Sequence, residues 1–389
     1  MMDGTGKMEF YGYEREDGSV GIRNHIAIIA VDALANRTVE AISRLIKNTV
    51  PITHPYGRLQ FGEDLDITFD TLIGTGCNPN VAAALVVGLE PEWTQKIVDG
   101  ISKSKKPVES VTIIRQGDHK ALERGARIAQ RMVSEASENL REPFSISDII
   151  VSIKCGSSDT TSGIASNPAV GAAVDKIIDE GGTVIFGETS ELAGAEHILA
   201  RRAVNDAVRE EFLKAFEEYV NFAISKGVDI FGSQPTAENI AGGLSTIEEK
   251  ALGNIQKTGT KPIQGVLRPA EKPRGKGLWF MNTSSSAQEA ITLFAAAGAV
   301  VHLFSTGQGS VVGHPIEPVI KISGNEITVK TMPEHIDVDV SGILKGTMSI
   351  EEAGDLILKT LLKTASGKLT ASEILCHNEF ALTRLWRSM

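Results

Sequence analysis

Two short segments in the second half of the chain carry many of the side chains that could do chemistry. In "CGSSDTTSGIASNP", Cys155 and Asp159 stand among hydroxyl and amide side chains that include Ser158, Ser162 and Asn167. Small hydroxyls and free backbone N–H groups at the start of a helix bind anions, so this segment predicts an anion site. An ordinary capped turn, with Cys155 as a small buried residue at a strand end, explains the same residues equally well.

The segment "GETSELAGAE" offers three carboxylates, Glu188, Glu191 and Glu196. Such groups suit ligation of a hard metal ion or removal of a proton from a carbon next to a carboxylate. By position, we interpret Glu188 and Glu191 as metal ligands or as the base. A solvated acidic helix start, which the helix dipole favours, is the alternative interpretation.

Two further segments, "NTSSS" and "STGQGS", supply uncharged donors that could hold a carboxylate or a sulfonate. The candidate substrate-binding residues in them are Asn282, Ser284, Ser285, Thr306, Gln308, Gly309 and Ser310. The glycines of the second segment also approximate a dinucleotide-binding loop, although the third glycine comes one position late. A plain glycine turn and a nicotinamide-dependent oxidoreductase therefore both remain as alternatives.

The first half offers fewer candidates. In "THPYGRLQFGEDLD", His54 could act as a base or a ligand, and Arg58 could neutralise an anion. A lone histidine or arginine is more often structural. We keep His54 as a catalytic candidate and Arg58 as a substrate-binding candidate.

The elements that position these residues are short apolar runs, typical of strands covered on both faces. The expected strands cover residues 25–31, 82–88, 110–114, 149–154, 183–186, 277–281 and 299–304. Helical patterns lie between them at about 36–47, 92–103 and 169–179, and a final helix is expected at about 350–362. Strands that alternate with helices indicate parallel sheets, whose ligands bind beyond the carboxyl ends of the strands. We therefore expect the polar segments of the second half to meet at one pocket.

The charged, proline-containing segment 134–147 separates two patterned halves and predicts a domain boundary. The sequence thus favours an α/β protein with two Rossmann-like, parallel-sheet, three-layer domains, at residues 8–140 and 148–389. Within the second, we expect a long helix over 196–226 with a break in it and an excursion outside the sheet over 257–276. Ser245 and Glu248 have the spacing of a helix capping box.

Composition excludes several classes of protein. The net charge of -10 opposes a nucleic-acid surface, since phosphate binding needs clustered lysine and arginine. The three cysteines lie far apart, which argues against a disulfide framework and against a self-contained iron–sulfur ligand set. The polar start does not resemble a signal peptide, and no apolar run is long enough to span a bilayer. We expect a cytoplasmic protein.

Five ordered motifs make the sequence similar to a known family. They are "GYEREDGSVGIRNH", "CGSSDTTSGIASNPAVG", "GETSELAGAEHI", "AGGLSTIEEKALGNIQK" and "STGQGS". Together, and over nearly the whole chain, they resemble the altronate and galactarate dehydratase family. The resemblance implies a lyase that acts on a small anionic hydroxy acid, with Cys155, Asp159, Glu188, Glu191 and His54 as its catalytic candidates.

The sequence departs from the sugar-acid dehydratase pattern at three places. "EPEW" follows Leu89 where the dehydratases typically run on Gly-Cys-Glu, Asn254 stands where they often carry cysteine, and Gln308 where they often carry arginine. These departures argue against a sugar-acid substrate. Within the family, the sequence resembles a branch that cleaves a carbon–sulfur bond and releases sulfite and pyruvate from 3-sulfolactate. The segments that carry this resemblance include "HPYGRLQFGEDLD", "NPNVAAALVVGLEPEWT", "FGETSEL", "GQGSVVGHPIEPVIK" and "TMPEHIDVDVSG". We interpret Gln308 as a neutral donor for the sulfonate group.

That resemblance implies ferrous iron, or another divalent metal, and a separate small subunit with a compact β-rich SAF-like domain. It further implies a hetero-oligomer that also associates with itself. A sugar-acid dehydratase is the nearest alternative, and a non-catalytic scaffold whose partner holds the catalytic groups is a third.

Overall fold

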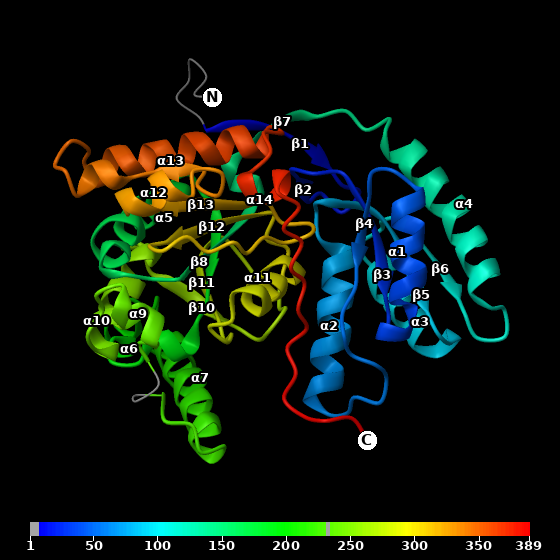
Figure 1. Cartoon of the computed structure of the whole chain (residues 1–389), viewed down its shortest axis with the longest axis horizontal. Coiled ribbons are helices and arrows are strands. Elements are labelled where there is room, and N and C mark those ends of the chain that lie inside the picture. Colours follow the sequence, from blue (N-terminus) through cyan, green and yellow to red (C-terminus); the bar gives the residue numbers. More distant parts are fainter. Residues whose placement is uncertain (1–7, 231–233) are drawn as a thin grey trace.

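The computed structural model describes residues 8–230 and 234–389 and confirms the α/β class (Figure 1). In that part of the chain, the first half forms a four-stranded parallel sheet in the order β4-β3-β5-β6. Its strands are β3 (His25–Ala30), β4 (Thr49–Ile52), β5 (Val81–Gly88) and β6 (Val108–Thr112). β4 is the one strand of this sheet that the sequence pattern does not predict.

Helices cover both faces of this sheet, which gives the expected three layers. The helices are α1 (Asn36–Leu45), α2 (Glu63–Cys77), α3 (Pro91–Ser102) and α4 (Asp118–Ala136). Successive side chains of a strand point to opposite faces. Ile26 and Ile28 accordingly pack in one core with residues of α1 and α4, while Ala27 and Ile29 pack with residues of α2 and α3. The apolar run of β3 follows from this burial on both faces.

The second half forms a seven-stranded parallel sheet in the order β10-β11-β9-β8-β12-β13-β14. Its strands are β8 (Ile150–Gly156), β9 (Thr183–Phe186), β10 (Ile263–Leu267), β11 (Gly277–Met281), β12 (Val301–Thr306), β13 (Val319–Ser323) and β14 (Val338–Asp339). Helices α5 (Asn167–Asp179), α7 (Asp206–Ser225) and α13 (Ile350–Ala365) share one apolar core with the sheet, and α11 (Ala287–Ala296) lies in another. β8 and β9, with β11 beyond them, occupy the middle of the sheet and carry the candidate residues at their ends.

Two expectations for the second half are wrong in detail. Residues 257–276 do not leave the sheet entirely, because β10 lies within them and pairs in parallel with β11 at the sheet's edge. The cap of α10 (Ile247–Ile255) is one residue later than expected: Thr246 is the N-cap and accepts from the backbone N–H of Glu249.

The long helix does break, as expected, into α6 (Glu196–Ala200) and α7, where Asn205 caps the second part.

The remaining elements are short. They are β1 (Glu9–Glu14), β2 (Val20–Gly21), β7 (Glu142–Ser145), α9 (Ala237–Ala241), α12 (Glu326–Thr331) and α14 (Ala371–Ile374). β7 lies in the segment that the sequence assigns to a domain boundary, and it pairs antiparallel with β1. Phe10 of β1 and Val20 of β2 pack in the core of the larger sheet. The division into domains at 8–140 and 148–389 stays a prediction.

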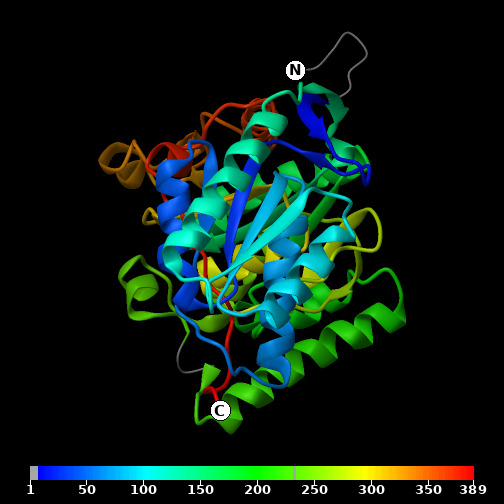
Figure 2. The same ribbon diagram turned by 90° about the vertical axis from the view of Figure 1, so that its right-hand side faces the viewer.

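The two halves are held against each other along α2 and α11 (Figures 1 and 2). The Asn78 amide donates to the carbonyls of Ala295 and Ala299, at 2.7 and 2.8 Å. The C-terminal segment, red in Figure 1, runs down between the halves, and Asp64 accepts backbone N–H groups near its end. Among the helices in residues 8–230 and 234–389, none has the length and apolar character needed to cross a membrane.

Candidate active site

A cavity of about 250 Å³ lies beyond the carboxyl end of β8. It is enclosed by the loop that follows β8, by the π-helical turn 162–166 that leads into α5, and by α10. Its lining includes six of the residues that the sequence singles out: Cys155, Ser158, Asp159, Ser162, Asn167 and Glu191. The expectation that the polar strand ends meet at a pocket thus has direct geometric support for these six.

Glu188 follows β9 in a left-handed backbone conformation, with φ of 68°. A residue other than glycine is strained there and needs its surroundings to hold it. Thr283, just after β11, provides that support by accepting the Glu188 N–H at 2.9 Å. The turn directs a fully buried carboxylate back toward the end of β8.

Two buried lysines hold the Glu188 carboxylate. Lys154 of β8 lies 2.7 Å from Oε1, and Lys257 lies 2.8 Å from Oε2. Burial alone raises the pKa of Glu188, but the two ammonium groups outweigh it and lower the pKa. Burial alone lowers the pKa of each lysine. The charge of Glu188 outweighs burial at Lys154, and Cys155 together with Glu188 outweighs it at Lys257, so the pKa of both lysines is raised. Glu188 is therefore a carboxylate with two permanent partners.

Glu191, three residues on, is held differently. Its Oε1 lies 3.2 Å from Nζ of Lys250, which also donates to Gln234 at 2.7 Å and Asn239 at 3.1 Å. Its Oε2 is buried and has no hydrogen-bond partner among the described residues, and the side chain lines the cavity. Of the two carboxylates, Glu191 is thus the one with an oxygen free to act on a ligand.

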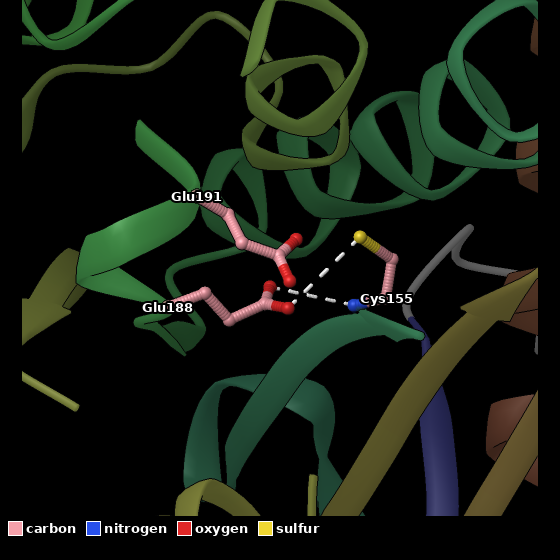
Figure 3. A group of neighbouring side chains, drawn as sticks. All are labelled: Cys155, Glu188 and Glu191. Carbon is pink, nitrogen blue, oxygen red and sulfur yellow. Dashed lines mark hydrogen bonds between the residues drawn. The ribbon is translucent and has the colours of Figure 1, made fainter. Parts of the chain in front are cut away.

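Cys155 lies beside both glutamates, which point toward it (Figure 3). Its Sγ is 4.0 Å from Oε1 of Glu188 and 3.1 Å from Oδ1 of Asn254. Burial raises the pKa of the thiol, and the charge of Glu188 adds to the rise. The Sγ and one carboxylate oxygen of each glutamate lie within 4.8 Å of one another, so the three residues form a possible metal site.

The other candidates from the loop after β8 have defined partners. Asp159 accepts from Thr161 Oγ1 at 2.6 Å, from Ser162 and from Asn325 Nδ2 at 2.7 Å, so its carboxylate braces the loop. Gln308 donates to the carbonyls of Glu238 and Ser158, at 3.1 and 3.4 Å, and ties the loop after β12 to the cavity wall. Their expected catalytic and sulfonate-binding roles stay predictions.

The strand-end residues of β11 and β12 stabilise loops. Asn282 accepts from Thr189, Ser285 bonds Ser190, and Ser284 donates to Glu289. Thr306 Oγ1 accepts the N–H groups of Gly309 and Ser310, at 3.1 and 3.0 Å. None of these seven residues, Gln308 included, is among the described residues that line the cavity. The loop of Gly307 to Gly313 leads to β13 rather than to a helix, so it lacks the helix N-terminus of a dinucleotide site.

His54 and Arg58 of the first half and Glu196 of the second half are not among the described residues that line the cavity. His54 is buried after β4, its Nε2 lies 3.2 Å from the carbonyl of Ala30, and burial lowers its pKa. Arg58 is half-buried, and its carbonyl accepts from Ser388 near the C-terminus. Glu196 accepts from the N–H of Gly194 at the start of α6. A structural role accounts for all three arrangements.

Sequence reasoning missed the three lysines of the site, Lys154, Lys250 and Lys257. One signal could have revealed Lys154: it ends "IIVSIK", a run expected to be buried on both faces, and a buried lysine needs an anionic partner. Lys250 and Lys257 lie on or just after α10, seven residues apart and thus two turns along one helical face. Nothing in their local sequence links them to Glu188 or Glu191.

Comparison with known proteins places these residues in a wider context. Residues 146–388 match the family described as D-galactarate/altronate dehydratase, C-terminal, and residues 12–137 match D-galactarate dehydratase/altronate hydrolase, second domain. The subunit beta of (2R)-sulfolactate sulfo-lyase from Chromohalobacter salexigens is 55% identical, over 97% of this chain and 98% of that protein. Altronate dehydratase of Bacillus subtilis is 28% identical over 97% of this chain and 78% of its own length. Galactarate dehydratase (L-threo-forming) of Escherichia coli is 31% identical over 92% and 73%.

Proposed function

This chain belongs to the D-galactarate/altronate dehydratase family, and we propose that it is the large subunit of a carbon–sulfur lyase that releases sulfite from (2R)-sulfolactate. The identity of 55% over nearly full length to a sulfo-lyase subunit supports the substrate. The free, buried Oε2 of Glu191 at the cavity carries the chemistry, because the reaction needs a base at C2.

In the proposed reaction, Glu191 Oε2 takes the proton from C2 of the substrate. The electron pair of that C–H bond forms the C2–C3 double bond, and the C3–S bond breaks with its pair on sulfite. The enol that remains becomes pyruvate when C3 takes up a proton and the hydroxyl gives one up. The burial of Glu191 keeps bulk water away from the oxygen that accepts the proton.

Lys250 gives Glu191 a defined orientation. Its ammonium group binds Oε1 and is itself fixed by Gln234 and Asn239, so Oε2 is the oxygen left for the substrate. Lys250 is also the one cationic side chain among the described residues that line the cavity. It offsets part of the negative charge of Asp159, Glu191 and Glu249, which also line the cavity, and it is the group there that can pair with a substrate carboxylate or sulfonate.

The implied divalent metal fits the donors that are present. Cys155, which lines the cavity, has its Sγ 4.0 Å from Oε1 of the buried Glu188, and a thiolate with a carboxylate suits iron better than magnesium or calcium. A carboxylate has about four lone-pair positions, so Glu188 retains capacity beside Lys154 and Lys257. Cys155 and Glu188 would hold the ion. When bound there, a ferrous ion would polarise the substrate and stabilise the negative charge that proton removal creates.

A separate partner subunit is part of the proposal. The chain spans 98% of the sulfo-lyase subunit beta but only 78% and 73% of two dehydratases, and its first half matches a domain described as the second. We propose that this chain works with a small, SAF-like subunit in a hetero-oligomer that also self-associates. The cytoplasmic location, with all three cysteines as free thiols, belongs to the same proposal.

The test is a product assay on the assembled enzyme. The chain is co-expressed with its small subunit, purified without oxygen and loaded with ferrous iron, then given 3-sulfolactate, altronate and galactarate in turn. Release of sulfite and pyruvate from 3-sulfolactate, lowered by about 10²- to 10⁴-fold in Glu191→Gln, is the expected result. Turnover of a sugar acid without any release of sulfite from sulfolactate would instead identify a dehydratase.

A further inference from the structure

Asn167 is the second residue of the cavity with a buried oxygen and no partner. Its side chain is 2% exposed, lines the cavity and stands at the first position of α5, directly after the π-helical turn 162–166. A π-helical turn inside a helix is rare and often marks a functional site. In this protein the π-helical turn directly precedes Asn167, which lines the cavity.

The orientation of the Asn167 amide is fixed by α10. Its Nδ2 donates to the carbonyl of Gly253 at 2.8 Å. Turning the amide over would bring two acceptor oxygens together, so Oδ1 must point the other way. That oxygen is buried and has no hydrogen-bond partner among the described residues. Leaving a buried acceptor unpaired costs about 1–3 kcal/mol, so a ligand that satisfies it gains affinity.

The two unpaired buried atoms of the described cavity lining are thus Asn167 Oδ1 and Glu191 Oε2. Oxygens of a carboxylate or an amide carbonyl only accept hydrogen bonds. The sulfonate and the carboxylate of sulfolactate also only accept, so neither can satisfy these atoms. The substrate has one hydroxyl donor, at C2, on the carbon that also carries the proton to be removed.

We propose that Asn167 Oδ1 accepts the hydrogen bond of the C2 hydroxyl and so selects 2-hydroxy acids while presenting the C2 proton to Glu191. This inference rests on the proposed function and deepens it. Two acceptors of the same cavity then receive the two hydrogens of one carbon centre, O–H at Asn167 and C–H at Glu191.

The experiment compares two ligands that differ by that hydroxyl alone. Dissociation constants of (2R)-3-sulfolactate and 3-sulfopropanoate are measured on the assembled, iron-loaded enzyme in the Glu191→Gln background, where turnover of sulfolactate is slowed by about 10²- to 10⁴-fold. We expect the hydroxyl to improve binding about 10- to 100-fold, as for a buried acceptor that would otherwise stay unpaired. Adding Asn167→Ala should reduce that ratio to within about 3-fold of unity, chiefly by weakening sulfolactate.

Two further variants distinguish loss of the acceptor oxygen from other effects of the substitution. Asn167→Asp retains an acceptor oxygen and adds a charge that repels both dianions alike, so both bind more weakly while their ratio is kept. Asn36→Ala is the matched control, because Asn36 also has a buried Oδ1 without a hydrogen-bond partner among the described residues and an Nδ2 that donates to a carbonyl, at 2.8 Å, but does not line the cavity. This variant should leave the ratio unchanged. A folded Asn167→Ala enzyme that still prefers sulfolactate as the parent does overturns the inference. If the wild-type enzyme releases no sulfite at all, the proposed function fails instead.

Discussion

Replacing Glu188 by glutamine tests the conclusion that this residue is the fixed counter-ion of two buried lysines. Glutamine keeps the length of the side chain and one acceptor oxygen, and it leaves the left-handed backbone position as it is. It removes the charge that faces Lys154 at 2.7 Å and Lys257 at 2.8 Å. Since both lysines are only 1% exposed, water cannot replace the lost partner.

The expected cost follows from those contacts. Removing one partner of a buried ion pair typically destabilises a protein by about 3–5 kcal/mol, because a buried charge is left uncompensated. The site can limit the cost by releasing a proton from one lysine, which from an ordinary pKa near 10.4 costs about 4.6 kcal/mol at pH 7. Both routes give about 3–5 kcal/mol, or about 4–6 °C in melting temperature for a chain of 389 residues.

The assay is thermal and urea unfolding of wild type and Glu188→Gln across pH. The lowered pKa of Glu188 stabilises the folded wild type above pH 4.5, and this contribution is lost as pH falls below that value. The raised pKa values of the lysines stabilise the wild type below pH 10.5, and this is lost as pH rises further. The difference between the two proteins should therefore be largest in the neutral range and should shrink at both extremes.

The matched control is Glu123→Gln, which removes an exposed carboxylate paired with Arg127 at 3.1 Å and should cost less than about 1 kcal/mol. If Glu188→Gln melts within about 2 °C of wild type at pH 7, the two lysines do not depend on this carboxylate and the assignment of its role is wrong.

Three other changes separate the remaining roles. Glu191→Gln should lower the turnover number by about 10²- to 10⁴-fold, as loss of a general base does, while the melting temperature stays close to wild type because Lys250 keeps two other partners. Cys155→Ser should abolish the thiolate-to-metal absorption that Co²⁺ gives with the wild-type protein; an unchanged spectrum would exclude Cys155 as a ligand. Thr246→Ala should cost about 1 kcal/mol in urea unfolding, and Ser245→Ala clearly less, since Thr246 is the cap of α10; equal costs would contradict that assignment.

Much of the fold could be predicted because most strands are buried on both faces. β3, β5, β8, β9, β11 and β12 appear in the sequence as continuous apolar runs. β13 escapes this pattern because Lys321 interrupts "VIKIS", although its side chain is buried. β4 escapes because Pro51 interrupts it, and a proline within a strand favours an edge position, which is where β4 lies.

The site could be predicted only in part, for a geometric reason. The rule that ligands bind beyond the carboxyl ends of parallel strands identifies the edge of the sheet where the ligand binds. It does not identify the face of the sheet on which the ligand lies at that edge. Cys155 and Glu191 lie on the side of α5 and α10, where the cavity is. Asn282 and Ser285 follow the neighbouring strand β11. They bond Thr189 and Ser190, in the turn that carries Glu188, and do not line the cavity. Which side holds the ligand depends on α10, whose position the strand pattern does not specify.

The division of labour between the two glutamates likewise depends on residues that no local motif identifies. Glu188 and Glu191 share one turn and the same chemical type, so their spacing alone assigns them interchangeable roles. Two lysines, one from β8 and one from beyond α10, each bind one oxygen of Glu188. A single lysine occupies one oxygen of Glu191 and is shared with two amides. The number of ammonium groups that reach each carboxylate therefore decides which one anchors the site and which one acts on a ligand.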